Sequence, residues 1–297
     1  MVNLSIIIVS YNTKELTTKC LQSIYKYQWK NTIDIWVVDN ASSDGSVEAI
    51  SKKFPKVKII ASKDNLGFAA GNNLALKKAK SEFYLLLNSD TEVMENSFDN
   101  LLEFANSNNF GICSCKVLNK DGSFQPNGGD LPEFLPLFFW LSGLDDFIKK
   151  IMVPISYQQR TQNYYKDGRE MGWVSGSVML IKKEVLEKIG LLDKKIFMYG
   201  EDVEFCLRAK RAGFKIGWTD KAQVVHLGGG SSKTPKYNQW LGEFKGLLYV
   251  YQKYYGWGRR LLLKILIYFF VMLRSIAFVI IGKFDYAKTY AKIIYKI

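Results

Sequence analysis

LSIIIVSYN, Leu4 to Asn12, joins an apolar run rich in β-branched residues to a short polar tripeptide. A continuous apolar run of this length is typical of a strand that is buried on both faces, as strands in parallel sheets are. The polar residues Ser10 to Asn12 then follow where that strand ends. The stretch therefore predicts a central strand near the start of the chain, with polar side chains at its carboxyl end.

Similar runs recur in the first 110 residues and alternate with segments of helical periodicity. Strands are predicted at 33–40, 57–62 and 82–90, and helices at 13–27, 46–54, 68–80 and 97–107. This βαβ alternation predicts an α/β protein with a mostly parallel sheet and helices on both faces. Ligands bind at the carboxyl ends of the strands in such sheets, where the motifs SYN, DNASSDGS and NSD fall.

The second part of the chain is less regular. Proline and glycine interrupt residues 121–172, which are predicted to form a long loop or a small subdomain over the active face. Beyond this segment, strands are predicted at 173–181 and 222–227, and helices at 183–189 and 198–213. The chain is predicted to be helical from Tyr237 to its end.

The composition indicates a folded protein, since 48% of the 297 residues are hydrophobic and suffice for a sizeable core. The formal charge is +13, but nine Lys and Arg residues and a single acid, Asp285, lie from Lys253 onward. The basic excess therefore belongs to the tail. The four cysteines have no CxxC spacing and are predicted to be free thiols in a reducing compartment. The N-terminal sequence lacks the features of a signal peptide, so we expect a cytoplasmic chain.

Several predicted strand ends carry side chains that suit a nucleotide. Asp39 can accept the imide N–H of a pyrimidine, and Tyr11 offers a face for stacking, although the same segment is typical of an ordinary strand-to-helix turn. The segment NLGFAAGNN, Asn65 to Asn73, opens a helix whose N–H groups favour a phosphate or are simply capped. Asp90 can hold a metal ion against a diphosphate, or is a turn aspartate.

Seven segments occur in one particular order: SIIIVSYN, VVDNASSDGS, NLGFAAGNN, LLLNSDTEV, WVSGSVMLI, IGLLDKKIFMYGEDVEFCLRAKRAGFKI and VVHLGGGSS. Each segment alone is unspecific. The ordered set, which runs from Leu4 to Ser232, resembles the inverting glycosyltransferases of family 2, and most closely their rhamnosyltransferase-like branch. The resemblance implies the Rossmann-like GT-A fold. It divides the chain into a nucleotide-sugar-binding half, 1–110, an acceptor-binding half, 111–235, and C-terminal membrane-associating helices, 236–297.

The resemblance also implies roles for individual residues. The nucleotide would be bound by Tyr11, Asn12, Asp39, Asn65, Gly67 and Asn88. Asp90 would hold Mg²⁺ or Mn²⁺, and His226, the only histidine of the chain, would be a further contact to the metal or the diphosphate. The family's metal motif often has an aspartate where this chain has Asn88, so the metal would depend on Asp90 and the diphosphate itself.

An acidic cluster, Glu201, Asp202 and Glu204, lies in the segment MYGEDVEFCLRAKRAG. The resemblance makes Asp202 the general base that takes the proton of the acceptor hydroxyl, with Glu201 and Trp173 in the acceptor site. The position suits a base, because a helix N-terminus stabilises negative charge and mutual repulsion raises one pKa. The alternative is a solvated first turn in which the acids serve only local stability. Arg208 would pair with the cluster or lie on the surface.

The tail holds an apolar segment, Leu261 to Ile281, that is long enough to cross a bilayer. Lys264 and Arg274 interrupt it, positive charge flanks both ends, and the aromatic segment YVYQKYYGWG precedes it. These features favour amphipathic or apolar helices that lie in an anionic membrane interface over a true span. Packing on the enzyme or a dimer contact is the alternative. We expect peripheral association with the inner face of the cell membrane.

Three functional hypotheses follow. The first is a metal-dependent inverting glycosyltransferase that transfers L-rhamnose from dTDP-rhamnose to a lipid-linked or cell-surface glycan intermediate. The second keeps the fold but uses a UDP-sugar, as a galactofuranosyl- or N-acetylhexosaminyltransferase does. The third, a basic nucleic-acid-binding protein, requires Lys and Arg along one face with interleaved aromatic residues. The basic residues instead gather beside an apolar helix, so nucleic acid is not expected as a partner.

Overall fold

The strands of the protein lie between Leu4 and His226, before the C-terminal helices. The computed structural model describes residues 2–149, 151–227 and 237–297. Within these residues the strands are β1 (Leu4–Ser10), β2 (Ile33–Asp39), β3 (Lys58–Ala61), β4 (Phe83–Asn88), β5 (Thr91–Val93), β6 (Ile112–Leu118), β7 (Phe124–Gln125), β8 (Gly128–Gly129), β9 (Arg169–Glu170), β10 (Trp173–Val174), β11 (Val178–Lys182) and β12 (Ile216–His226).

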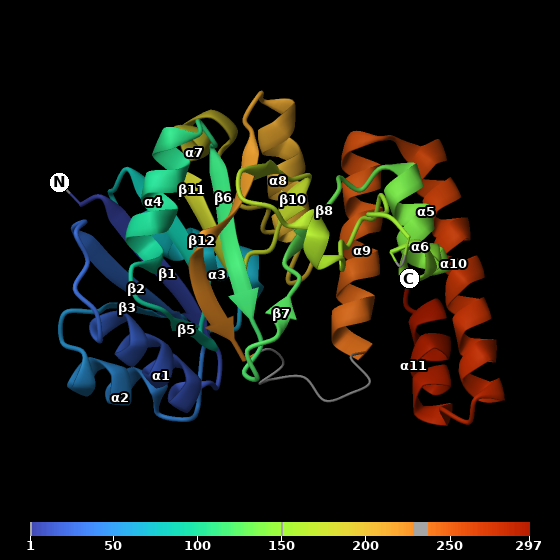
Figure 1. Ribbon diagram of the computed structural model, residues 1–297. Helices are drawn as coiled ribbons and strands as arrows, with labels where there is room; N and C mark the ends of the chain where they lie inside the picture. The colour runs from blue at the N-terminus through green and yellow to red at the C-terminus, as the bar shows by residue number, and fades with distance from the viewer. Residues whose placement is uncertain (1, 150, 228–236) are drawn as a thin grey trace.

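Most of these strands form one mixed sheet (Figure 1). Its order is β3-β2-β1-β4-β11-β6-β12-β5, with β7 paired to β6 and β9 to β12, while β8 and β10 form a separate pair. The pairs β1–β2, β1–β4, β2–β3 and β6–β12 are parallel, and β11 runs antiparallel to both of its neighbours. The predicted α/β fold with a mostly parallel sheet is confirmed.

Helices cover both faces of this sheet because side chains alternate along its strands. Ile6 and Ile8 of β1 belong to a buried cluster with α1 (Lys14–Tyr25), α2 (Ser46–Lys53) and α4 (Ser97–Ser107). Ile7 points to the other face, where α3 (Gly67–Leu76) and α8 (Glu201–Arg211) supply the buried side chains. The remaining helix of this part, α7 (Lys183–Ile189), follows β11 directly.

The register of the central strands fixes where the polar strand ends meet. Ser10 pairs with Asp39 across β1 and β2, and Val9 pairs with Asn88 across β1 and β4. Because these strands are parallel, the segments that follow them leave the sheet at the same edge. The SYN, DNASSDGS and NSD segments are therefore neighbours in space, as the sequence predicted.

Three segments differ from the prediction. The segment 173–181 is not one strand: Trp173 and Val174 pair with β8 as β10, and after a turn at 175–177 the chain enters the main sheet as β11. Strand β6 was missed, since its sequence ICSCKVL has neither strict alternation nor a purely apolar run. Strand β12 begins at Ile216 rather than at residue 222, because a polar bulge between Thr219 and Gln223 interrupts its pattern.

Residues 121–172 form a small subdomain rather than an open loop. They contain β7, β8 and β9, the helices α5 (Phe134–Ser142) and α6 (Leu144–Ile148), and a 3₁₀ turn at Gln162–Tyr164. Tyr157 and Trp140 pack edge to face at 5.0 Å, and Tyr157 is buried. Aromatic packing thus replaces regular hydrogen-bonded structure as the source of order in this part of the chain.

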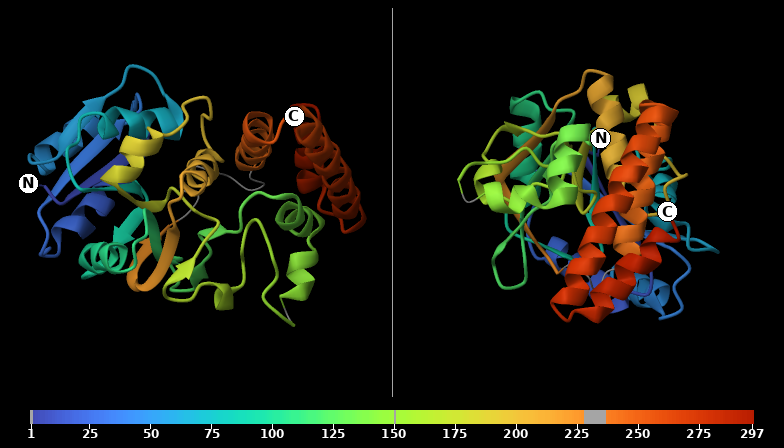
Figure 2. Two further views of the ribbon diagram at one scale, coloured as in Figure 1. Left: turned by 90° about the horizontal axis from the view of Figure 1, so that it is seen from above. Right: turned by 90° about the vertical axis from the view of Figure 1, so that its right-hand side faces the viewer.

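The C-terminal helices stand beside the sheet and the subdomain (Figures 1 and 2). They are α9 (Tyr237–Tyr254), α10 (Trp257–Ile280) and α11 (Phe284–Ile294), so the predicted helical tail is confirmed for the described residues. Phe244 and Leu247 of α9 share a buried cluster with Phe205 of α8. Within the described part of the chain, α10 is the one helix long and apolar enough to cross a membrane, with a mean hydropathy of 2.2.

Candidate active site

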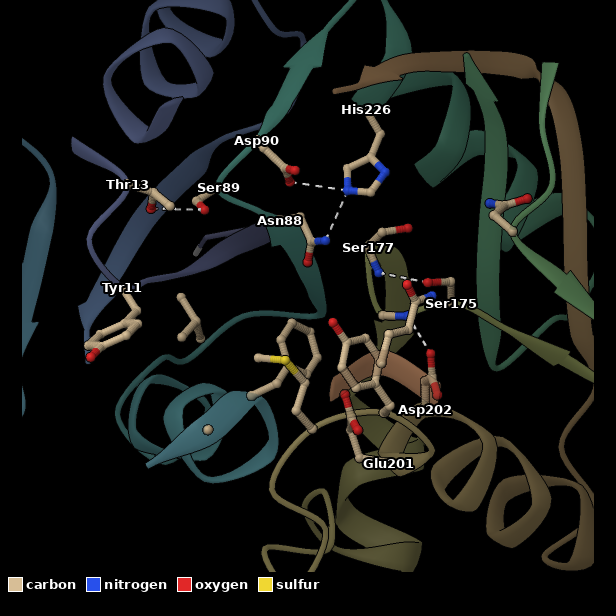
Figure 3. A pocket seen from close by; sticks show the side chains of 18 of the residues that line it. Tyr11, Thr13, Asn88, Ser89, Asp90, Ser175, Ser177, Glu201, Asp202 and His226 are labelled. Atoms are coloured by element: carbon tan, nitrogen blue, oxygen red, sulfur yellow. Dashed lines mark hydrogen bonds and ion pairs between the residues drawn. The ribbon is translucent and has the colours of Figure 1, made fainter. Parts of the chain in front are cut away.

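A cavity of about 510 Å³ lies at the edge of the sheet where the central strands end. Residues from the ends of β1, β4 and β12, from the turn between β10 and β11, and from the start of α8 line it. Figure 3 shows Asp90 and His226 on one side of this cavity, Glu201 and Asp202 on the other, and Tyr11 at a third position. Of the predicted site residues, Tyr11, Asn65, Gly67, Asn88, Asp90, Glu201, Asp202 and His226 line the cavity.

Asp39 and Asn12 lie beside the cavity without lining it. Asp39 is 3% exposed, and its Oδ2 accepts a hydrogen bond from the Ser42 amide at 2.9 Å. Its Oδ1 is buried and has no hydrogen-bond partner among the described residues. Asn12 Oδ1 accepts from the Ser43 amide at 2.8 Å, so both side chains order the turn after β2. Asp39 Oδ1 therefore retains the capacity to accept one further hydrogen bond.

The glycine loop before α3 contacts the loop before α8. Gly67 has a φ of +77°, and a Cβ at this position would lie 2.2 Å from the Phe197 carbonyl oxygen, so only glycine fits. The Phe68 amide donates to that same oxygen at 2.8 Å. Farther along α3, Asn73 exchanges two hydrogen bonds with the backbone of Leu192, at 2.8 and 3.1 Å. These contacts join the two halves of the predicted fold.

Asp90, His226 and Asn88 converge at the carboxyl end of β4. His226 Nε2 lies 3.1 Å from Asp90 Oδ1 and 3.1 Å from Asn88 Nδ2 (Figure 3). On the other side of the ring, Nδ1 donates to Gln125 Oε1 at 2.7 Å, because that amide oxygen can only accept. In the neutral ring, Nε2 therefore presents its lone pair toward the Asp90 carboxylate.

This corner can hold a divalent metal ion. An imidazole nitrogen and a carboxylate oxygen that face each other are two acceptors, and a cation between them resolves the repulsion. No third His, Cys, Asp or Glu joins Asp90 and His226 in the part of the chain that the structure describes. The remaining ligands of a bound metal would come from water or from a substrate. The residues present thus fit an ion that is completed by a diphosphate.

The N-terminus of α8 brings two acids to the cavity, the buried Glu201 and the half-buried Asp202. Gly200 precedes it with a φ of +98°, so the chain turns sharply into the helix. Asp202 Oδ2 accepts from the Gly176 amide at 3.1 Å, and Oδ1 accepts from the Val203 amide at 2.8 Å. Burial raises the pKa of Asp202, against the effect of these hydrogen bonds. Burial and the adjacent charge of Asp202 raise the pKa of Glu201 well above its usual range, and Glu201 Oε2 has no partner among the described residues.

Glu204 has a different environment from its two neighbours. Its side chain is buried, and it forms ion pairs with Arg208 at 2.9 Å and with Lys253 of α9 at 2.8 Å. Burial raises its pKa, but hydrogen bonds from Arg208 and Lys253 outweigh this, so the pKa of Glu204 is lowered. The alternative of a solvated first turn is wrong for both Glu201 and Glu204, because tertiary packing covers them. Arg208 pairs with the cluster.

Trp173 does not lie in the cavity. Its ring is 7% exposed and stacks on Tyr157 at 5.4 Å, and its Nε1 donates to the Tyr157 carbonyl oxygen at 2.7 Å. Trp173 therefore packs against the subdomain and does not face the cavity. The resemblance implied that Trp173 lies in the acceptor site, but the residues of the segment WVSGSVMLI that reach the cavity are Ser175, Gly176 and Ser177.

Helix α9 contributes polar residues that the sequence did not reveal. Gln239 lines the cavity. Glu243, one turn farther on, is 8% exposed and accepts a hydrogen bond from Gln158 Nε2. Burial and the charge of Asp202 raise the pKa of Glu243 to about 7. No local pattern marks these residues, because their environment depends on how α9 packs against α8.

The class of this protein follows from a family model that covers more than half of the chain. The family model described as Glycosyl transferase family 2 matches residues 5–190. The chain belongs to glycosyl transferase family 2.

Curated relatives agree with this assignment. The low-salt glycan biosynthesis hexosyltransferase of Haloferax volcanii is 29% identical over 233 residues, which cover 75% of this chain and 67% of that protein. The N-acetylglucosaminyl-diphospho-decaprenol L-rhamnosyltransferase of Mycobacterium tuberculosis is 23% identical over 75% of each chain. Relatives of this kind support the predicted rhamnosyltransferase-like branch.

Two solved structures share the fold. A mannosyltransferase from Pyrobaculum calidifontis in complex with GDP-Man and Mn²⁺ has a TM-score of 0.58 and 16% identity, over 98% of this chain and 73% of that chain. GalNAc-T7 with UDP, GalNAc and Mn²⁺ has a TM-score of 0.59 and 17% identity, over 85% of this chain and 48% of that chain. The predicted GT-A fold is confirmed.

Proposed function

We propose that the protein is a metal-dependent inverting glycosyltransferase that transfers L-rhamnose from dTDP-rhamnose to a glycan acceptor. The observation that carries the proposal is the position of Asp202 in the cavity, with Asp90 and His226 on the opposite side (Figure 3). An acid that is fixed by two backbone amides suits proton transfer at one end of a substrate. A cation-binding pair at the other end suits a diphosphate.

The nucleotide base would be bound near Tyr11 and Asp39. Tyr11 is 48% exposed and lines the cavity, so its ring is available for stacking. The unpartnered Oδ1 of Asp39 matches the imide N–H that thymine and uracil both carry. Adenine and cytosine have no such ring N–H, whereas guanine has one at N1, so this contact favours thymine, uracil or guanine. The choice of thymine rests on the rhamnosyltransferases among the relatives.

The diphosphate would be bound at the corner formed by Asp90 and His226. When bound there, Mg²⁺ or Mn²⁺ neutralises the charge that develops on the departing nucleotide diphosphate. Gln125 holds the His226 ring by its Nδ1–H, which leaves Nε2 directed at the site. Two of the structural neighbours were solved with Mn²⁺, which supports a divalent cofactor of this kind.

Asp202 would act as the general base. One of its oxygens takes the proton of the acceptor hydroxyl while the acceptor oxygen forms its bond to the anomeric carbon. The bond from that carbon to the diphosphate oxygen breaks at the same time, with inversion and without a covalent intermediate. The raised pKa of Asp202 brings its basicity closer to that required near neutral pH. Glu201 would support the acceptor from the neighbouring position.

A second candidate keeps this site but uses a UDP-sugar, as a galactofuranosyl- or N-acetylhexosaminyltransferase. The contact offered by Asp39 suits it equally, since uracil has the same imide N–H. A rhamnosyl donor is preferred because rhamnosyltransferases are among the relatives. The acceptor would be a lipid-linked or cell-surface glycan intermediate, which agrees with a cytoplasmic protein peripherally attached to the inner face of the membrane.

The test is release of nucleotide diphosphate from a panel of dTDP-, UDP- and GDP-sugars with Mg²⁺ or Mn²⁺. We expect metal-dependent release from dTDP-rhamnose, and loss of about a thousandfold in rate in Asp202→Asn. Asp220→Asn, at an exposed position, is the matched control and keeps full activity. Unchanged nucleotide release in Asp202→Asn would show that Asp202 is not the base. Release from a UDP-sugar alone would show that the donor is a UDP-sugar rather than dTDP-rhamnose.

A further inference from the structure

Helix α10 presents two opposite apolar faces. Leu263, Ile267 and Val271 recur every four residues and are buried. A second stripe recurs at the same helical spacing, and each of its side chains is at least 40% exposed: Leu261, Ile265, Phe269, Met272, Ile276 and Val279. A helix with an apolar inner face and an apolar outer face needs a second apolar environment.

The charges that interrupt this segment in the sequence do not lie on the outer stripe. Arg274 follows Val271 by three positions and therefore continues the inner face. Its Nη2 donates to the carbonyl oxygens of Trp140 and Leu141, at 3.0 and 2.9 Å, at the end of α5. Lys264 lies 5.4 Å from the Tyr268 ring. The outer stripe is thus free of charge along almost all of α10.

A second segment near α10 also carries exposed apolar side chains. Helices α5, α6 and α10 lie together in both views of Figure 2, and Phe138 of α5 packs on Phe270 of α10 at 5.8 Å. Phe147 of α6 is 72% exposed, and Ile151 just after it is 89% exposed. Helix α5, which contacts both α6 and α10, thus brings exposed apolar side chains near α10 although they lie more than 100 positions earlier in the sequence.

Helix α11 limits how α10 can be oriented relative to a membrane. It packs along α10, with Phe278 and Tyr290 stacked at 5.6 Å and Ser275 Oγ donating to the Ala287 carbonyl oxygen at 3.0 Å. Its exposed positions include Lys288 and Lys292. If α10 crossed a bilayer, these ammonium groups would enter the hydrocarbon, at a cost of several kcal/mol. An α10 that lies parallel to the membrane plane avoids this.

We infer that α10, α6 and the segment 151–155 form a composite surface that inserts into one leaflet of an anionic lipid bilayer. Exposed basic residues complement anionic headgroups around the apolar stripe: Arg259, Lys283, Lys288, Lys292 and Lys296. The inference rests on the peripheral location proposed above and extends it to a surface built partly by the subdomain. It does not depend on the identity of the donor sugar.

The test is sedimentation of the full chain with vesicles of phosphatidylglycerol or of phosphatidylcholine. We expect the native chain to bind the anionic vesicles at least about tenfold more tightly than the zwitterionic ones. Each of two variants should bind the anionic vesicles at least about tenfold more weakly than the native chain. The variants are Ile265→Glu/Ile276→Glu and Phe147→Glu/Ile151→Glu. Tyr25→Glu/Met94→Glu, at exposed apolar positions outside the surface, is the matched control and binds as the native chain does.

Nucleotide release in solution is measured in parallel, because vesicle binding and transferase chemistry can fail independently. Unchanged vesicle binding in the α6 variant would overturn the composite surface. Resistance of the bound protein to alkaline extraction would overturn the in-plane orientation in favour of a span. A third outcome would assign the surface to a second copy of the chain instead. In that case the native chain does not bind vesicles and forms a dimer in gel filtration, and Ile265→Glu/Ile276→Glu abolishes the dimer.

Discussion

Gly246 of α9 lies directly against Gly200, the residue that precedes α8. A Cβ built on Gly200 would lie 3.1 Å from the Gly246 Cα atom, and one built on Gly246 would lie 2.5 Å from the Tyr199 carbonyl oxygen. The backbones touch because neither residue has a side chain. The C-terminal helix therefore supports the turn that presents Glu201 and Asp202 to the cavity.

Gly246→Val is expected to lower both stability and transferase activity. The added carbons have no space against the Tyr199 carbonyl, and overpacking of this kind costs about 1–3 kcal/mol. Thermal unfolding and nucleotide release measure the two effects. Gly258→Val in α10 is the control, since a Cβ there meets nothing within 4 Å. Equal behaviour of the two variants would contradict the close packing of α9 on α8.

Glu243→Gln is expected to change how stability depends on pH. The folded state raises the pKa of Glu243 from 4.5 to about 7, so between these values it holds a proton that the unfolded chain has lost. The free energy of unfolding therefore falls as pH rises through this window, by about 3 kcal/mol in total. The glutamine variant lacks this loss and becomes the more stable protein at pH 8.

Denaturant titrations of both proteins at pH 5 and pH 8 measure this difference. Glu187→Gln, which makes the same change at an exposed position, is the control. A native protein and a Glu243→Gln variant with parallel pH profiles would show that Glu243 titrates normally.

Tyr11→Ala is expected to weaken donor binding without slowing the chemical step. Stacking of a base on an aromatic ring contributes about 0.5–1.5 kcal/mol, so the donor KM should rise about two- to tenfold at unchanged kcat. Initial rates over a range of donor concentrations separate the two constants. Tyr25→Ala, at a similarly exposed tyrosine, leaves both constants unchanged. A fall in kcat at constant KM would instead indicate that Tyr11 acts on the transition state.

Asp90→Asn is expected to weaken metal binding in the presence of nucleotide diphosphate. Loss of one of the two proposed protein ligands should reduce Mn²⁺ affinity by at least about tenfold, the range found even for outer partners of metal ligands. Electron paramagnetic resonance of free Mn²⁺ gives the affinity independently of turnover. The exposed Asp64→Asn serves as the control. Removal of metal with a chelator should abolish nucleotide release, and added Mn²⁺ should restore it.

The first half of the fold could be predicted because its signals are local. Buried strands such as β1 and β4 are continuous apolar runs, and the helices between them show the helical period. Strand β6 and the early part of β12 were missed because their sequences mix small, polar and charged residues. Their pairing partners, rather than their own periodicity, hold them in the sheet.

The site was predicted in part for a similar reason. Motifs at strand ends gave Tyr11, Asn88 and Asp90, because the register of parallel strands brings such ends together. Glu201 and Asp202, on the other side of the cavity, lie at the start of α8 and were predicted from the family resemblance. Glu243 and Gln239 could not be found, since their position depends on the packing of α9 against a glycine turn some 40 residues earlier. The prediction placed Trp173 in the acceptor site, but its indole packs outside the cavity. Strand β10 ends at Val174, and the residues between β10 and β11 line the cavity instead.

The paired hydrogen bonds between Asn73 and Leu192, together with the contact of Phe68 with Phe197, have a consequence for recombination within the family. A chimera that exchanged residues 1–110 for those of a relative would separate these partners and leave a buried amide without its match. A folded exchange is expected to need the segment 192–197 together with residues 1–110. These two parts of the chain therefore form one structural unit, despite their separation in the sequence.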